Sequence, residues 1–470
     1  MTDVAIIGGG FTGAAVAYHL ARAGVAADIV VFEPRRQLGA GLAYGGRDPT
    51  HRINVPATRM SLLPDDETHF ARWLETSGAL ATDPQALSGG AAFPRRQDFG
   101  RYVDEALRPF VAGHRVRHVA DVVVFVTRAG SGWRLATGAG ETRRADFVVI
   151  ATTHPAPSIP RQLLGVAADP RLVANGLADD ALDGVARDDR LLIVGTGLTA
   201  ADIAASLDAR GHEGPITMIS RRGLRSRGHA PRPFPAEGDF SSSPAREATQ
   251  LLARIRSAVR DAVAAGRTWH PVLDAVRVNG GEIWRALSPE ARRRVVRHLR
   301  PYWDVHRFRA APQIDAVLDR RLAEGSLEIR KARLGTVEAD RQGFVVELED
   351  VRRHTSTRQA FDRIIVATGP AHGDVLRTQP FLGELARQRY VALDSSGLGL
   401  RTSLEGRAMD ALGVASPNLF IAGPLARGTF GELMGMPQVA EYARFIAEQL
   451  LGAVDDERRA LPLALSAASG

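Results

Sequence analysis

The stretch "VAIIGGGFTGAAVAYHL", residues 4–20, decides the fold of this chain. It places the pattern Gly8-x-Gly10-x-x-Gly13 between an apolar, strand-like run and an alanine-rich helix. Glycines at this spacing allow a tight turn, let the backbone approach a pyrophosphate and pack the helix against the strand. The N-terminus of such a helix offers N–H groups to phosphates. The stretch therefore predicts a dinucleotide-binding βαβ unit.

The second strand of this unit is expected over residues 29–32 and ends at Glu33, twenty positions after Gly13. An acid at that place accepts a hydrogen bond from a ribose 2′-OH. The glycine pattern alone is a weak signal, so the alternative is a glycine-rich turn that binds no nucleotide. We favour nucleotide binding because strand, helix, second strand and acid all fall in register.

The same pattern recurs in the middle of the chain, in "LLIVGTGLTAADIAASL", residues 191–207. Here Gly195-x-Gly197-x-x-Ala200 follows an apolar run and opens a second alanine-rich helix. Alanine is permitted in the third place of the fingerprint. The chain is therefore expected to bind two nucleotides.

An arginine pair follows the next strand of the second unit, which is expected over residues 216–219. Arg221 and Arg222 stand where the first unit has Glu33. Guanidinium groups pair with a 2′-phosphate through two hydrogen bonds, which favours NADPH over NADH. The alternative is that both are surface arginines, which are abundant in this chain.

Each fingerprint is followed by a run of short strands, in residues 115–150 and again in 327–370, and each run closes on a strand that ends in Ala-Thr. The repeated order predicts an α/β fold with two Rossmann-like dinucleotide-binding domains. The paired Ala-Thr ends mark the two crossings at which the second domain is inserted into the first.

Composition narrows the class of protein. The chain has 470 residues, 45% hydrophobic and 24% charged, which is typical of a soluble globular protein. Its net charge of +7 is spread along the chain among acidic residues, so no nucleic-acid partner is expected. Cysteine is absent, which excludes redox cysteine pairs and the disulfide reductases that use them. We expect no membrane span, no metal site and a cytoplasmic location.

The segment after the second crossing, residues 418–450, reads as a strand, a glycine-rich turn and a long helix. The turn near residues 431–435 would present backbone N–H groups and the positive end of a helix dipole to an electron-rich group. A reduced isoalloxazine ring fits that description, so Gly431 is expected to lie beside a flavin, and Gly423, at the end of the strand before this turn, is also taken as a cofactor-binding residue.

The arrangement resembles the flavoproteins with two dinucleotide-binding domains, and more narrowly a bacterial family of FAD/NAD(P)-binding proteins. The resemblance rests on "HRINVPATRMSLLPDDETHFARWL", residues 51–74, and on "WRALSPEARRRVVRHLRPYWDVHRFRAAP", residues 284–312. The flavoprotein urate hydroxylases are similar to this family, which gives urate, and so purine degradation, as a candidate substrate and role.

The resemblance implies where the cofactors lie. FAD would bind in the first unit, at Gly8, Gly10, Gly13 and Glu33, and NAD(P)H in the inserted domain. Asn54 and Pro56 would lie near the flavin, and Arg221 and Arg222 near the nicotinamide nucleotide. One departure concerns Gly423-Pro424, because related flavoproteins have Gly-Asp there and use that carboxylate to bind the ribityl chain.

The domain boundaries follow from these assignments. We expect the FAD-binding domain over residues 1–158 and 361–451, and the NAD(P)H-binding domain over 159–360. Residues after 451 are expected to form a frayed tail. Within the second domain, about 223–325 exceed what a nucleotide-binding domain needs, and helices are expected there at about 245–265, 289–299 and 312–324.

This helical insert gathers three of the five tryptophans and several histidines and arginines. The functional interpretation is that it covers the flavin and presents His306, Arg307 and Arg309 to an anionic, planar substrate. An arginine fork would hold the anion and an aromatic wall would stack on it. The structural alternative is an interhelical core of tryptophans with histidines in structural hydrogen bonds.

Three functions are compatible with these observations. We favour an FAD-dependent monooxygenase that takes electrons from NADPH and hydroxylates a small polar substrate with O2. The second candidate is an NAD(P)H dehydrogenase that passes electrons from FAD to a quinone or a protein. The third is a flavin-binding sensor without catalysis. The oligomeric state is not predicted.

Overall fold

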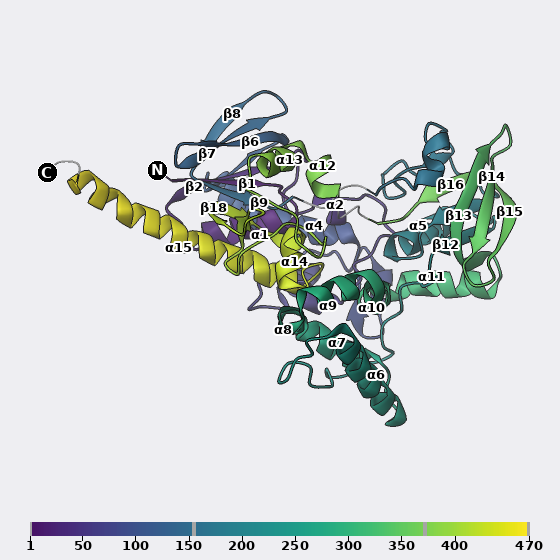
Figure 1. The fold of residues 1–470 in the computed structure, drawn as a ribbon. Helices are drawn as coiled ribbons and strands as arrows, with labels where there is room; N and C mark the ends of the chain where they lie inside the picture. The colour runs from purple at the N-terminus through teal and green to yellow at the C-terminus, as the bar shows by residue number, and fades with distance from the viewer. Residues whose placement is uncertain (1, 153–156, 370–373, 468–470) are drawn as a thin grey trace.

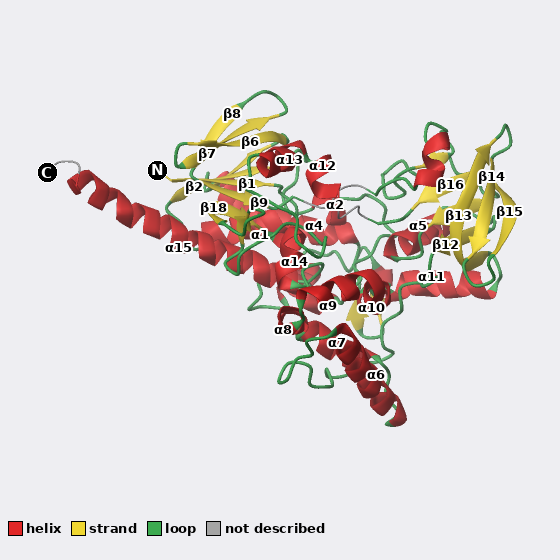
Figure 2. Cartoon of the chain, in the orientation of Figure 1, coloured by secondary structure: helices red, strands yellow, loops and turns green. Residues whose placement is uncertain are grey.

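Two mostly parallel β-sheets organise the chain, and helices surround and connect them (Figure 1, Figure 2). The structure is a computed structural model that describes residues 2–152, 157–369 and 374–467, with the backbone alone after Arg459. The first sheet has the order β17-β18-β9-β1-β2-β5. Its strands are β1 (Thr2–Ile7), β2 (Ala27–Phe32), β5 (Val116–Val119), β9 (Phe147–Ile150), β17 (Arg407–Met409) and β18 (Ala415–Ile421).

Strand β1 is the centre of the first sheet. It runs parallel to β2 and to β9, with Val4 opposite Ile29 on one side and Phe147 on the other. Residues 4–7 are buried, as expected for a strand that is covered on both faces. Helix α1 (Phe11–Arg22) follows β1 and packs against α4 (Arg96–Ala112) and α15 (Gln438–Ala467).

A separate three-stranded antiparallel sheet accompanies the first domain. It consists of β6 (Val123–Ala129), β7 (Gly132–Thr137) and β8 (Thr142–Ala145). Trp133 on β7 is fully buried, and its indole N–H donates to Asn418 Oδ1 at 3.1 Å. This hydrogen bond joins the small sheet to β18. Helix α13 (Pro380–Arg387) packs on β6.

The second sheet has the order β10-β16-β11-β12-β13-β14-β15. Strand β13 pairs in parallel with β12 at its start and antiparallel with β14 at its end, so the meander of this half is continuous with the main sheet. The strands are β10 (Leu172–Val173), β11 (Leu191–Val194), β12 (Ile216–Ser220), β13 (Leu327–Ala339), β14 (Phe344–Asp350), β15 (Thr355–Phe361) and β16 (Arg363–Val366).

Strand β16 shifts one of the expected boundaries. It pairs with β10 and β11, and therefore belongs to the second sheet although it lies beyond residue 360. The first sheet resumes only with β17 and β18, where β18 pairs with β9. The second domain thus includes the Ala-Thr strand end that was expected to mark its exit.

The insert contains more helices than the sequence predicted. Helices α7, α8 and α10 were missed because each is short; α7 and α8 adjoin at Asn279 and Gly280, and α10 begins where the expected helix 289–299 ends. Helix α11 packs on α5 (Leu198–Ala209), so it is the crossover helix of the second domain. The helices are α6 (Ala248–Ala264), α7 (His270–Val278), α8 (Gly280–Ala286), α9 (Pro289–Arg294), α10 (Arg300–Arg307) and α11 (Pro312–Ala323).

The C-terminal segment differs from the expected frayed tail. Helix α15 continues to Ala467, past the end that was placed near residue 451. Val454 is fully buried, which extends the packing of this helix beyond the expected boundary. Figure 1 shows the end of α15 projecting away from the rest of the chain. Among the described residues, no helix is both long and apolar enough to cross a membrane.

The remaining elements are short and connect the larger ones. They are α2 (Gly41–Tyr44), α3 (His69–Thr76), α12 (Val375–Thr378), α14 (Arg427–Phe430), β3 (Leu87–Ser88), β4 (Ala91–Ala92), the 3₁₀ helices Ala57–Arg59, Pro84–Ala86, Arg161–Val166 and Gly423–Ala426, and the π-helical turn Val295–Leu299.

Candidate active site

The glycines of the first fingerprint are required by packing. A Cβ on Gly8, whose φ is +99°, would lie 2.7 Å from the carbonyl oxygen of Ala151 at the end of β9. A Cβ on Gly13 would lie 1.9 Å from the carbonyl oxygen of Gly8, so that α1 could not approach β1. Gly10 is the N-cap of α1. The turn therefore brings the N-terminus of α1 to the edge of the sheet, as a dinucleotide requires.

Glu33 occupies the place expected for a ribose-binding acid. It follows β2 and is 4% exposed. Its Oε2 accepts the N–H of Gly9 at 3.0 Å, and its Oε1 accepts the backbone N–H of Arg35 at 3.1 Å and the Arg35 guanidinium at 2.9 Å. These hydrogen bonds fix the carboxylate beside the glycine turn.

Gly423 lies where β18 meets the start of α1. Its φ is +72°, and a Cβ there would lie 2.6 Å from Thr12 Oγ1. The close approach explains why glycine is kept at this position although Pro424 replaces the expected carboxylate. Gly39 and Gly41 lie against the same turn: the Gly39 N–H donates to the Gly9 carbonyl at 2.7 Å, and a Cβ on Gly41 would lie 2.9 Å from Gly10 Cα. The residues around α1 thus fit a bound FAD, held by backbone groups and Glu33.

The second fingerprint has the same turn but more open space. A Cβ on Gly195 would lie 2.1 Å from the carbonyl oxygen of Ala367 on the neighbouring strand end. Gly197 is the N-cap of α5, and a Cβ there would meet nothing within 4 Å. Ala200 is fully buried. The open side of Gly197 leaves room for a pyrophosphate at the N-terminus of α5.

The arginine pair after β12 divides into two environments. Arg221 is exposed, and its side chain makes no hydrogen bond or ion pair with the residues that the structure describes. Arg222 packs over the ring of Tyr302, with 5.4 Å between its Cζ and the ring centroid, and donates to the His298 carbonyl at 3.4 Å. Arg222 therefore connects the second unit to the insert, while Arg221 is available to a phosphate.

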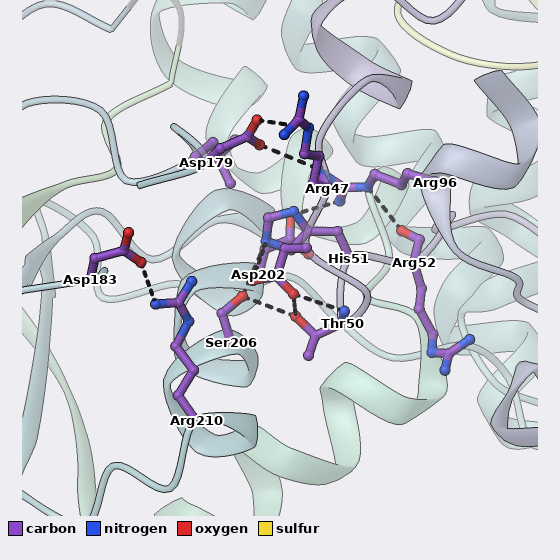
Figure 3. Close-up of polar contacts among 12 residues, drawn as sticks. Arg47, Thr50, His51, Arg52, Arg96, Asp179, Asp183, Asp202, Ser206 and Arg210 are labelled. Carbon is purple, nitrogen blue, oxygen red and sulfur yellow. Dashed lines mark hydrogen bonds and ion pairs between the residues drawn. The ribbon is translucent and has the colours of Figure 1, made fainter. Parts of the chain in front are cut away.

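A polar interface joins the two nucleotide-binding units (Figure 3). Arg96 on α4 donates to Asp202 on α5 at 2.6 Å, and Asp202 is 2% exposed. One turn later, Ser206 Oγ lies 2.9 Å from Thr50 Oγ1 and 3.2 Å from His51 Nε2. The helix that follows the second fingerprint is thereby hydrogen-bonded to the segment that precedes residues 54–59, which we call the Asn54 loop.

The Asn54 loop is held by a histidine from the second domain. His229 Nε2 donates to the Asn54 carbonyl at 3.1 Å, and the His229 ring contacts Phe93. Burial, followed by the charge of Arg309, lowers the pKa of His229 to about 4. The imidazole is therefore neutral at physiological pH. Pro56, which fixes the turn after Asn54, is the N-cap of the 3₁₀ helix Ala57–Arg59.

Two of the expected substrate residues lie around Trp269. Arg309 makes two hydrogen bonds to Asp274, at 2.8 and 3.2 Å, and its Cζ lies 5.2 Å from the centroid of the Trp269 ring. His306 packs edge-on against the same ring and donates from Nδ1 to the Tyr302 carbonyl at 2.7 Å. A substrate anion would have to compete with Asp274 for Arg309.

Arg307 faces the loop after α14. It is 6% exposed, and its Nε donates to Glu432. Trp303 also donates to Glu432, at 3.3 Å. A Cβ on Gly435 would lie 3.1 Å from Arg307 Nη2. The structure thus separates the three expected catalytic residues into two groups, His306 with Arg309 and Arg307 with Glu432, and their catalytic role stays a prediction.

Sequence reasoning missed the residues that dock the insert on the FAD-binding domain. The Trp284 indole donates to the Gly428 carbonyl at 2.7 Å. Gly431, with φ of +80°, approaches so closely that a Cβ would lie 2.8 Å from Trp284 Cβ. Gly431 was expected beside the flavin, and that placement stays a prediction; the structure shows that Gly431 packs against Trp284 of the insert. Gly428, Gly431 and Gly435 were a signal of this close packing, but from the sequence only the turn near residues 431–435 was related to the flavin.

The N-terminal third of the chain matches a known family of nucleotide-binding proteins. Residues 5–155 match an FAD-NAD(P)-binding family. This match, with the solved structures below, confirms FAD and NAD(P)H as the cofactors expected for this chain. The sequence matches no curated protein.

Solved structures share the whole fold. An ornithine hydroxylase from Pseudomonas aeruginosa matches 96% of this chain and 99% of its own, with a TM-score of 0.66 and 16% identity. An ornithine N-hydroxylase from Kutzneria sp. 744, with reduced FAD, NADP⁺ and L-ornithine, covers 97% and 100% at a TM-score of 0.61 and 17% identity. A bacillithiol disulfide reductase from Staphylococcus aureus covers 96% and 99%, with a TM-score of 0.54 and 15% identity.

These matches confirm the α/β fold with two Rossmann-like nucleotide-binding domains. At such low identities they establish the fold alone, and the fold is shared by hydroxylases and a disulfide reductase. The choice of reaction therefore has to come from residues of this chain.

Proposed function

We propose that this chain is an FAD-dependent, NADPH-using monooxygenase that acts on a small polar substrate. FAD binds at residues 8–13, with Glu33 on its ribose, and NADPH binds at residues 195–200, with Arg221 on its 2′-phosphate. When bound, FAD supplies the transfer of electrons from NADPH to O₂. The chain holds both nucleotides, encloses the substrate and excludes water.

The observation that carries this proposal is that one insert contacts both nucleotide-binding units. On one side, Arg222 of the second unit packs on Tyr302 of α10. On the other, Trp284 of α8 donates to Gly428, which follows β18 of the first sheet. Helix α8 packs against α14, and Figure 1 shows the two beside each other. A substrate bound under this insert would be close to the parts of the chain where the two nucleotides meet.

The chain's composition separates a monooxygenase from the reductases that share the fold. It contains no cysteine, and a disulfide reductase of this architecture needs a redox pair of thiols or a thiol substrate site. O₂ needs no such group, because the flavin carries the chemistry. This argues against a disulfide as the electron acceptor, and the O₂ and quinone measurements described below separate the two remaining acceptors.

The substrate is the finer part of the proposal. The similar hydroxylases act on ornithine, which has a nucleophilic amine and a carboxylate. Urate, suggested by the resemblance of the sequence to flavoprotein urate hydroxylases, is a planar anion. Both are small and polar, and both would suit an insert that is rich in tryptophan and arginine.

The experiment measures NADPH oxidation by the FAD-loaded protein in air, together with O₂ uptake and peroxide release. L-ornithine, putrescine and urate are added in turn. The proposal expects one of them to stimulate NADPH oxidation and O₂ uptake equally, with little peroxide. Stimulation with full peroxide release would identify an effector that is not hydroxylated.

The same preparation tests the rival functions. Faster turnover with a quinone under anaerobic conditions than with O₂ would favour an NAD(P)H dehydrogenase. Failure of NADPH to reduce the bound flavin would favour a non-catalytic flavin-binding protein. Either result would displace the monooxygenase.

A further inference from the structure

The contact between the insert and the first domain contains more positive than negative charge. Glu432 pairs with Arg307, Asp304 with Arg300 at 3.2 Å, and Asp274 with Arg309 at 2.8 Å. These three carboxylates are the acidic groups that influence the charges of Arg277 and Arg427. Three further guanidinium groups, those of Arg59, Arg277 and Arg427, have no carboxylate partner among the described residues.

Arg427 is the clearest case of an unpaired buried charge. It starts α14 and is 4% exposed. Its side chain makes no hydrogen bond or ion pair with any residue in the described part of the chain, and its Nε is buried without a partner. Burial, followed by repulsion from Arg300, lowers its pKa to about 10. The guanidinium nevertheless stays charged at neutral pH.

Arg277 on α7 is a second buried arginine whose charge interacts with that of Glu432. It is 8% exposed, and its Nη2 donates to two neutral acceptors, the Met436 carbonyl and Gln438 Oε1, the latter at 3.2 Å. Its Nε is buried without a partner, as is Nη2 of Arg307. Burial, followed by the charge of Arg307, lowers the pKa of Arg277 to about 9. Two arginines without a carboxylate partner among the described residues, and a free N–H of Arg307, thus all interact electrostatically with Glu432 or belong to its ion-pair partner.

Burying a charge without a counter-ion costs free energy, and buried charges in folded proteins are usually paired with an opposite charge. We propose that Arg277 and Arg427, together with the free Nη2 of Arg307, bind an anionic group of the substrate. The proposal rests on the proposed function for the identity of the ligand as substrate. The anion would lie beside Glu432, in a place that Arg59 of the Asn54 loop also approaches.

The ligand class follows from guanidinium chemistry. Planar guanidinium groups present paired N–H donors that match a carboxylate or a similar delocalised oxyanion. The carboxylate of an amino acid and the monoanion of urate both meet this description. A diamine without a carboxylate does not, and would gain nothing from these arginines.

Thermal unfolding of the FAD-loaded protein tests the site without turnover. L-ornithine, glutarate and urate are the anionic probes, putrescine is the matched amine without a carboxylate, and ionic strength is held constant. We expect at least one anion to raise the Tm of the wild type by several degrees, and putrescine not to. The proteins compared are the wild type, Arg427→Met, Arg277→Met and, as a control, Arg256→Met, an exposed arginine of the same insert.

In both site variants the anion concentration needed for the same shift should rise at least tenfold, and Arg256→Met should respond as the wild type does. Without an anion, Arg427→Met should be at least as stable as the wild type, because an unpaired buried charge has been removed. A purely structural arginine would show the opposite. If Arg427→Met does not fold, Arg277→Met carries the comparison.

Three results would overturn the proposal. The first is that none of the anions stabilises the wild type. The second is that both site variants respond as the wild type does. The third is that Arg427→Met loses FAD, which would make Arg427 a cofactor residue. An anion response in a protein whose O₂ uptake no substrate stimulates would instead reject the proposed function and leave the anion site standing.

Discussion

The two nucleotide-binding units share one fingerprint but differ in how much of each site is filled. In the first, Glu33 is buried and already bonded to the Gly9 N–H. In the second, Gly197 faces open space and Arg221 is exposed without a partner among the described residues. A site that is fixed in advance suits a resident cofactor, whereas an open one suits a nucleotide that enters and leaves at each turnover.

The two units also differ in how the strands of their antiparallel meanders join the main sheet. The meander of the first unit is a separate sheet, joined to β18 through Asn418, whereas that of the second continues the main sheet through β13. The second unit is tied to the first by α5, through Asp202 and Ser206. The second unit is thus docked against the first by polar contacts.

The largest expected effect concerns the third position of each fingerprint. Gly13→Ala would place a Cβ 1.9 Å from the Gly8 carbonyl oxygen, and we expect a loss of about 3 kcal/mol or more of stability and of FAD retention. The converse change, Ala200→Gly, should cost only about 1 kcal/mol and leave NADPH binding intact. FAD content and thermal unfolding measure both. Full FAD content in Gly13→Ala would refute the packing argument.

The next effect concerns the contact between the units. Asp202→Ala would leave the Arg96 guanidinium without its carboxylate at a buried site, and we expect a loss of about 3 kcal/mol. Asp183→Ala is the matched control, because its ion pair with Arg210 is solvent-exposed and should contribute less than about 1 kcal/mol. Chemical denaturation compares the two. Equal losses would show that the Arg96 contact does not fix the units.

A third prediction concerns pH. The pKa of His229 is lowered to about 4 from an ordinary value of 6.5, so the unfolded chain takes up a proton first as the pH falls. Burial of the neutral His229 therefore does not reduce the free energy of unfolding above pH 6.5. As the pH falls from 6.5 to 4, it should reduce the free energy of unfolding by up to about 3 kcal/mol. His229→Gln should flatten this part of the stability profile.

His19, which has a similarly lowered pKa in the first unit, provides the comparison for that profile. His19→Gln should also flatten the acid limb. Only His229→Gln should in addition change the rate of flavin reduction, because His229 holds the Asn54 carbonyl. Identical kinetic effects of the two substitutions would remove the assigned role of His229.

The smallest expected effect concerns nucleotide choice. Arg221→Ala should weaken NADPH binding about tenfold, or about 1.4 kcal/mol, and leave NADH binding unchanged. Because Arg221 is exposed, the thermal stability should not change. The ratio of kcat/KM for NADPH to that for NADH measures the effect. A parallel loss for both nucleotides would place Arg221 away from the 2′-phosphate.

The sequence predicted the local features of both units well. Apolar runs and glycines gave β1, α1, β11 and α5 to within about two residues, because these signals lie within one short segment. It did not predict contacts that join distant segments. Arg96 and Asp202 are 106 residues apart, and Arg307 and Glu432 are 125 apart. No local pattern links such pairs, so Glu432 and Arg427 were not identified as part of the site.

The most direct test of the two-nucleotide account is anaerobic mixing of the FAD-loaded protein with an equimolar amount of NADPH, followed by the visible absorbance of the flavin. The account predicts that the absorbance is lost with NADPH, and more slowly with NADH at the same concentration. If the flavin stays oxidised with both nucleotides, the second fingerprint does not deliver electrons to the first, and the account is wrong.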